Sequence, residues 1–113
     1  MSTVKGVVQY TISKDGLLTG LWANGGPTYN EIAQKLNMEP GKVIPLEGTY
    51  KVVWLQDNAE RVDATLEIKV VNPKKYYTLE WRNKQGNHMF SGHGYLLTHE
   101  TLVVRYDDDP LTP

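Results

Sequence analysis

The sequence predicts an all-β protein, an antiparallel up-and-down β-barrel of about eight strands with one short α-helix near residues 28–37. Two observations lead to this fold class. Short segments in which apolar and polar residues alternate recur along the chain, and that alternation is typical of half-buried strands. Turn sequences of hairpin length separate the segments, such as SKDG at 13–16 and NKQGN at 83–87.

Eight segments have the strand pattern, and they cover most of the chain. They are residues 4–13, 17–22, 42–46, 48–56, 62–71, 76–82, 89–96 and 101–106. The alternation is clearest in VDATLEIKVV at 62–71, where Val62, Ala64, Leu66, Ile68 and Val70 share the face that we expect to be buried. Pro45 limits the segment 42–46 to an edge, a bulge or irregular structure.

The pattern changes period once, in TYNEIAQKLN at 28–37. Four residues there form a stripe at helical spacing: Tyr29, Ile32, Ala33 and Leu36. Thr28 and Glu31 have the spacing of a capping box, and Pro40-Gly41 follows the stripe as a stop signal. The sequence therefore predicts a helix here.

Consecutive short hairpins describe a meander, and a twisted meander has two unpaired edges. Closing the sheet into a barrel removes both edges, so a barrel is the favoured architecture. The alternative is an open sheet wrapped over the helix.

Composition and charge narrow the possible functions. The 113 residues are expected to form a single domain, 1–113, and the absence of cysteine excludes disulfides and thiolate chemistry. Twelve Lys and Arg residues against thirteen Asp and Glu give a net charge of −1 without a basic cluster, which argues against nucleic-acid binding. The apolar runs are too short to span a membrane, and the N-terminal residues do not resemble a signal peptide. We therefore expect a cytoplasmic protein, with secretion after removal of an upstream signal peptide as the alternative.

The predicted interior is rich in large aromatic side chains. An eight-stranded barrel is either just filled by its side chains or holds one small ligand. The candidate ligand-binding residues are Trp22, Tyr50, Trp54, Tyr77, Trp81, Phe90, His93 and Tyr106. Their rings suit a small hydrophobic or aromatic molecule, and no cofactor or metal is predicted. Gly92 and Gly94 either leave space on the inner face or allow the strand to bend for barrel closure.

Several short motifs resemble those of a known group of barrels. Gly20-Leu21-Trp22 forms a G-x-W tripeptide near the start of the chain, and GTYKVVW, YYTLEW and FSGHGYL follow as aromatic-rich strands. Together they resemble the calycin group, which includes lipocalins, avidins and fatty-acid-binding proteins. The chain differs from lipocalins in having a strand before G-x-W and a helix early in the sequence. The resemblance implies a barrel able to bind a small hydrophobic ligand, and it implies no catalytic residue.

All three histidines lie within HMFSGHGYLLTHE at 88–100. In a regular strand, Ser91, His93 and Tyr95 share one face and Phe90, Gly92, Gly94 and Leu96 share the other. The first set is expected on the outer wall. A bulge or reversed register at residues 92–94 would turn His93 inward instead, where it would line the ligand site.

These observations lead to three hypotheses about function. The first is a non-enzymatic barrel that binds a small hydrophobic or aromatic ligand. The second is a filled barrel that acts in protein interaction, with a homodimer interface on an outer wall that includes Val53, Leu55, Leu97 and Val103. The third is a small hydrolase or isomerase that uses His93, for which a serine nucleophile would also need an orienting acid and an oxyanion hole.

Overall fold

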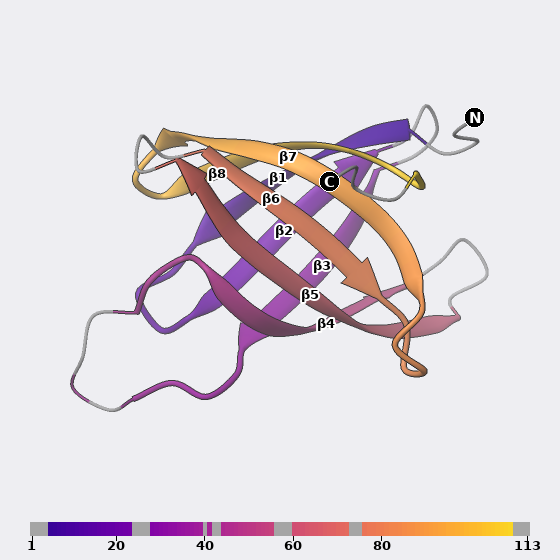
Figure 1. The fold of residues 1–113 in the computed structure, drawn as a ribbon, viewed down its shortest axis with the longest axis horizontal. Coiled ribbons are helices and arrows are strands. Elements are labelled where there is room, and N and C mark those ends of the chain that lie inside the picture. The colour runs from indigo at the N-terminus through magenta and orange to yellow at the C-terminus, as the bar shows by residue number, and fades with distance from the viewer. Residues whose placement is uncertain are drawn as a thin grey trace.

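The computed structural model describes residues 5–23, 28–39, 41, 44–55, 60–72 and 76–109, which form a closed barrel of eight antiparallel strands (Figure 1). The strands are β1 (Lys5–Ile12), β2 (Leu17–Ala23), β3 (Tyr29–Lys35), β4 (Gly48–Leu55), β5 (Arg61–Asn72), β6 (Tyr76–Arg82), β7 (His88–Thr98) and β8 (Thr101–Asp107). Each pairs with the next along the chain, and β8 pairs with β1. The predicted all-β antiparallel barrel is confirmed.

Closure is made by seven residue pairs between β1 and β8, from Lys5 opposite Asp107 to Thr11 opposite Thr101. Each strand therefore has two hydrogen-bonded neighbours, and the sheet has no open edge. The alternative of an open sheet wrapped over a helix is wrong.

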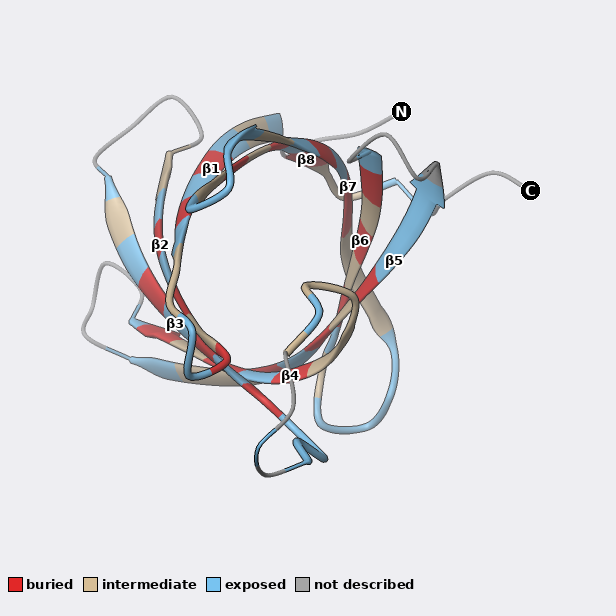
Figure 2. Cartoon of the chain, turned by 90° about the vertical axis from the view of Figure 1, so that its left-hand side faces the viewer, coloured by how far each residue is buried: buried red, intermediate tan, exposed pale blue. Residues whose placement is uncertain are grey.

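The interior is formed by the alternate residues of each strand, as the sequence pattern predicts (Figure 2). The ten largest fully buried side chains fill the middle of the barrel: Tyr10, Tyr50, Leu18, Leu66, Ile68, Leu79, Leu102, Val8, Val52 and Val104. Val70 is an exception to the predicted inward set, because it is 44% exposed where the pairing of β5 with β6 shifts register.

The predicted helix over residues 28–37 is wrong, because Tyr29–Lys35 is strand β3. β3 pairs with β2 on one side and β4 on the other, and these long-range hydrogen bonds override the local helical pattern. Ile32 and Ala33, adjacent in the predicted stripe, point to opposite faces, since Ala33 is fully buried and Ile32 is 54% exposed. Glu31, the predicted capping residue, faces the barrel interior.

Residues 44–47 between β3 and β4 form no strand, in agreement with the restriction that Pro45 imposes. Some predicted positions lie outside the described residues. They are Val4 of the predicted first strand, Pro40 of the predicted helix stop, and residues 42–43 of the predicted short strand.

Gly92 and Gly94 face inward, as predicted, but they leave no empty space. A Cβ added at Gly92 would lie 2.8 Å from Val104 Cγ1 and 2.9 Å from the Arg105 carbonyl oxygen. A Cβ at Gly94 would lie 2.9 Å from Val104 Cγ2. The two glycines therefore allow β8 to pack closely against β7.

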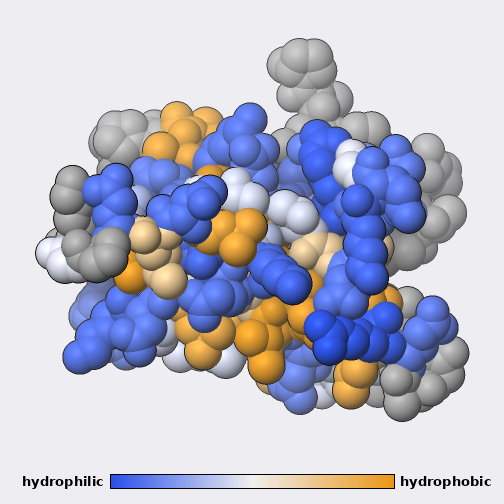
Figure 3. Space-filling model, turned by 90° about the horizontal axis from the view of Figure 1, so that it is seen from below, coloured by the Kyte–Doolittle hydropathy of each residue, from blue (hydrophilic) through white to orange (hydrophobic). Residues whose placement is uncertain are grey.

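The outer wall carries apolar side chains among polar ones (Figure 3). Val7, Leu21, Ile32, Leu55, Tyr95 and Leu97 are each more than half exposed. Within the described residues, no helix has the length and apolar character needed to span a membrane.

The close approach of β7 and β8 predicts a cost for any side chain at Gly92. Gly92→Ala should lower the free energy of unfolding by about 1–3 kcal/mol, because the Arg105 backbone cannot rotate away from the new methyl group. Urea denaturation measures the change. Thr65→Ala, on the exposed face of β5, serves as the comparison. Equal stability of Gly92→Ala and the parent protein would contradict the packing described for these strands.

Candidate functional site

The antiparallel order gives the barrel two chemically different ends. One end, here called the tryptophan end, holds Trp22, Trp54 and Trp81 near the last residues of β2, β4 and β6. The other, here called the cavity end, is bounded by the turn at residues 13–16, the turn at 99–100 and the segment 44–47. The packed middle of the barrel separates the two ends.

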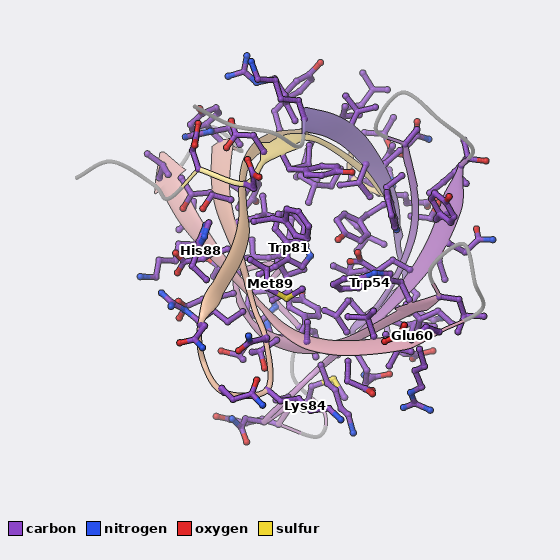
Figure 4. All side chains as sticks on the ribbon, turned by 90° about the vertical axis from the view of Figure 1, so that its right-hand side faces the viewer. Trp54, Glu60, Trp81, Lys84, His88 and Met89 are labelled. Atoms are coloured by element: carbon purple, nitrogen blue, oxygen red, sulfur yellow. The ribbon has the colours of Figure 1, made fainter. Side chains whose placement is uncertain are left out.

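Aromatic rings contact one another across the tryptophan end. The ring centroids of Trp22 and Tyr29 are 4.6 Å apart, and those of Trp22 and Tyr106 are 6.4 Å apart. Tyr106 also contacts Trp81 at 6.0 Å and Phe90 at 5.7 Å. Trp54, Trp81 and Met89 point into the barrel (Figure 4). These contacts lie in the range in which aromatic pairs stabilise a core.

The barrel interior next to these rings holds a buried carboxyl group, that of Glu31. Glu31 is only 5% exposed, and its Oε2 accepts a hydrogen bond from the Tyr10 hydroxyl, which is also buried. Trp81 acts as a second hydrogen-bonding partner of this carboxyl. The group thus joins β1, β3 and β6 through the barrel interior.

Burial shifts the titration of both partners. Desolvation raises the pKa of Glu31 from 4.5 to about 7, and the hydrogen bonds from Tyr10 and Trp81 oppose that rise. Desolvation and the neighbouring Glu31 carboxyl raise the pKa of Tyr10 well above its ordinary value. The Glu31 carboxyl therefore changes its protonation near neutral pH inside the barrel.

The Trp22 indole nitrogen is buried and has no hydrogen-bond partner among the described residues. Buried indole N–H groups usually find an acceptor, so this one is an unsatisfied donor at the tryptophan end.

The cavity end contains a pocket of about 230 Å³ that is partly open to solvent. Its walls present both apolar and polar groups, and they come from β1, β2, β4, β6 and β7 and from three connections. The lining residues are Ile12, Ser13, Gly16, Leu18, Ile44, Pro45, Leu46, Tyr50, Tyr77, Leu96 and His99. Burial raises the pKa of Tyr50 to about 12, which keeps its phenol neutral at physiological pH. The cavity thus combines aliphatic side chains and two tyrosine rings with the polar side chains of Ser13 and His99.

The histidine-rich strand β7 lies mostly on the outer wall. His93 is exposed and stacks on Tyr76, with the ring centroids 6.0 Å apart. The register of β7 keeps Gly92 and Gly94 inside, so His93 does not line the interior. The alternative in which a bulge or reversed register at residues 92–94 turns the His93 side chain inward is therefore wrong.

A bulge in β7 instead occurs at Met89, between the pairs Trp81–Phe90 and Arg82–His88. The extra residue brings His88 onto the same face as Ser91, and His88 Nε2 lies 2.8 Å from Ser91 Oγ. Ser91 is 4% exposed on the outer side of the strand. The serine of this segment thus contacts His88, whereas the sequence-based hydrolase hypothesis relied on His93.

No group of three or more His, Asp or Glu side chains is placed to hold a metal ion in the part of the chain that the structure describes.

The predicted ligand-binding residues therefore divide into separate groups. Trp22, Trp54, Trp81, Phe90 and Tyr106 gather at the tryptophan end, and Tyr50 and Tyr77 line the cavity end. The sequence analysis missed Glu31 and Lys35 as interior residues, because it assigns Glu31 to a helix cap and Lys35 lies within the predicted helix. The period-two spacing of Glu31, Ala33 and Lys35 could have indicated a strand with these three side chains on one face. Two of the three are charged, however, and charged residues are rarely found on the buried face of a strand.

Comparison with known proteins gives no relative: no family model, curated protein or solved structure matches this chain.

The buried Glu31 carboxyl predicts a pH-dependent stability. Between its unfolded pKa of 4.5 and its folded pKa of about 7, the folded state holds a proton that the unfolded state releases. The Glu31 contribution to the free energy of unfolding should therefore fall by about 3 kcal/mol as pH rises through this window, and then level off. Glu31→Gln should lose this pH dependence and gain stability relative to the parent protein above pH ~7.

Urea unfolding at a series of pH values measures this effect. Glu67→Gln, a change at an exterior carboxylate of β5, provides the matched control and should keep the pH profile of the parent protein. Identical pH profiles for Glu31→Gln and the parent would contradict a neutral-pH titration of Glu31.

Proposed function

We propose that this protein is a non-enzymatic barrel of the calycin kind that binds a small hydrophobic or aromatic molecule. The observation that supports the proposal is the cavity of about 230 Å³ at the cavity end, lined by aliphatic side chains and the rings of Tyr50 and Tyr77. Ligand sites are concave and combine apolar walls with polar groups that orient the ligand, and this pocket presents both kinds of group.

The size of the cavity limits the ligand. Pockets for drug-sized molecules measure roughly 300–1,000 Å³, whereas an apolar cavity of about 150 Å³ holds benzene or xenon. A space of about 230 Å³ lies between these cases. The proposed ligand is accordingly a compact molecule of one or two rings.

Indole is a suitable probe, and the chain supplies its own reporters of position. All three tryptophans lie at the tryptophan end, whereas Ile12, Leu18 and Leu96 line the cavity. Indole should shift the methyl resonances of these three residues in two-dimensional NMR and leave the tryptophan indole N–H resonances in place. Shifts confined to the tryptophan resonances would move the site to the other end, and no shifts at millimolar indole would contradict small-ligand binding.

A cavity-filling variant tests the same site. Leu96→Trp places a larger side chain in the cavity wall and should weaken indole binding at least about tenfold, since the ligand and the new ring compete for one space. Leu97→Trp is the control, because Leu97 is 63% exposed on the outer face of the same strand. Equal binding by the two variants would show that indole sits elsewhere.

A second candidate function is protein interaction through the outer wall. Ile32 lies opposite Val53 in the register of β3 and β4, and Leu21 and Leu55 lie on the same outer face of the neighbouring strands. The result is an apolar patch on the β2–β4 side of the barrel. Exposed apolar patches of this kind often mark interfaces, and a symmetric homodimer is the simplest assembly.

Sedimentation velocity at micromolar concentration tests this second function. If the patch forms a homodimer, the protein should sediment as a dimer, and Ile32→Lys should convert it to a monomer. Thr65→Lys, on the exposed face of β5, should leave the dimer intact. A parent protein that remains monomeric at these concentrations would exclude this homodimer.

A further inference from the structure

One wall of the cavity is a short irregular segment, residues 44–47, here called the strap. Ile44, Pro45 and Leu46 of the strap line the cavity. The strap leads directly into β4, which begins at Gly48. Because the strap belongs to no strand of the barrel, side-chain contacts must contribute to its position.

Two side chains fasten the strap to the barrel through its backbone carbonyls. Lys35 Nζ donates a hydrogen bond to the Glu47 carbonyl oxygen at 2.7 Å and another to the Pro45 carbonyl oxygen. The Tyr50 hydroxyl donates to the Leu46 carbonyl oxygen at 2.7 Å. Three consecutive carbonyl groups, from Pro45 to Glu47, are therefore bound by side chains of β3 and β4.

The surroundings of Lys35 are adapted to hold it in this position. Lys35 is 9% exposed on the inner face of β3, and its Nζ lies 5.9 Å from the centre of the Tyr50 ring. A Cβ on residue 48 would lie 2.7 Å from Lys35 Cε, and Gly48 has φ +141°, so glycine leaves room for the lysine stem. Burial lowers the pKa of Lys35, and the nearby Glu47 opposes that change.

We propose that Lys35 is the positioning residue of the cavity: it holds the strap in place as a wall, and it directs the cavity to neutral ligands. This inference rests on the proposed function, and it adds the class of ligand. The Lys35 ammonium binds strap carbonyls and does not line the cavity.

The charges of the described lining residues support a neutral ligand. Among the described lining residues, His99 has the one basic side chain, and that side chain is 89% exposed beside Glu100. A carboxylate ligand would therefore lose water without gaining a buried counter-ion, which is unfavourable. A neutral ring compound meets no such penalty.

The first experiment measures the strap without any ligand. Lys35→Met removes the ammonium and keeps an apolar stem, and hydrogen exchange of peptides that cover residues 44–49 should become about tenfold faster. Lys51→Met, an exposed lysine on the outer face of β4, removes the same charge and should leave exchange unchanged. Unchanged exchange in Lys35→Met would overturn the positioning role.

A second variant makes the result independent of how Lys35→Met folds. Tyr50→Phe removes one strap hydrogen bond and keeps the ring, so exchange over residues 44–49 should also rise, with β6 and β7 peptides unaffected. If Tyr50→Phe and Lys35→Met both exchange like the parent protein, the strap is held by other forces and the proposal fails.

The second experiment compares indole with indole-3-carboxylate by NMR titration. The parent protein should bind indole at least about tenfold more tightly than the carboxylate, because the described lining residues offer the anion no buried cation. Lys35→Met should bind indole more weakly, with faster dissociation, because the strap is loosened. Tight carboxylate binding that disappears in Lys35→Met would show that Lys35 is a counter-ion for ligand, which overturns the neutral class.

The two experiments separate this inference from the proposed function. If the strap loosens in Lys35→Met but indole does not bind the parent protein, the positioning of the wall holds and the small-ligand function fails. If indole binds but strap exchange and indole affinity are the same in Lys35→Met and the parent, the function holds and the role of Lys35 is refuted.

Discussion

The pairing of β1 with β8 is the interaction on which the other features of this protein depend. It joins residues that are far apart in the sequence, from Thr11 with Thr101 to Lys5 with Asp107, and it leaves every strand with two hydrogen-bonded neighbours. Because the sheet closes, the inner faces of distant strands meet: Glu31 on β3 reaches Tyr10 on β1, and Tyr106 on β8 contacts Trp81 on β6. An open sheet would place these side chains on a surface in contact with water.

The packed middle of the barrel gives the two ends independent chemistry. Fully buried residues such as Leu66, Leu79 and Val104 occupy the centre, so a ligand at one end does not contact the other. The tryptophan end joins an aromatic cluster to a buried carboxyl group, while the cavity end has a partly open pocket and a strap held by an ammonium group. A buried polar group is stable only where hydrogen bonds satisfy it, and both Glu31 and Lys35 have such bonds.

Strand positions could be predicted wherever local alternation and tertiary burial agree. In β5, Ala64, Leu66 and Ile68 are apolar in sequence and buried in the barrel, so the prediction and the structure coincide. In β3 they disagree, since the buried face carries Glu31 and Lys35 while Ile32 points outward. Local spacing therefore favoured a helix, and only pairing with β2 and β4 made the segment a strand.

The sequence by itself determined the all-β class, the order of most strands and the face to which their apolar residues point, because alternation with period two is a local property. It also determined that His93 shares a face with Ser91. Tertiary structure decided that the predicted aromatic site divides between two ends and that a bulge at Met89 brings His88 to Ser91. It also decided that Lys35 fastens a cavity wall, since that contact joins segments which only barrel closure and loop packing bring together.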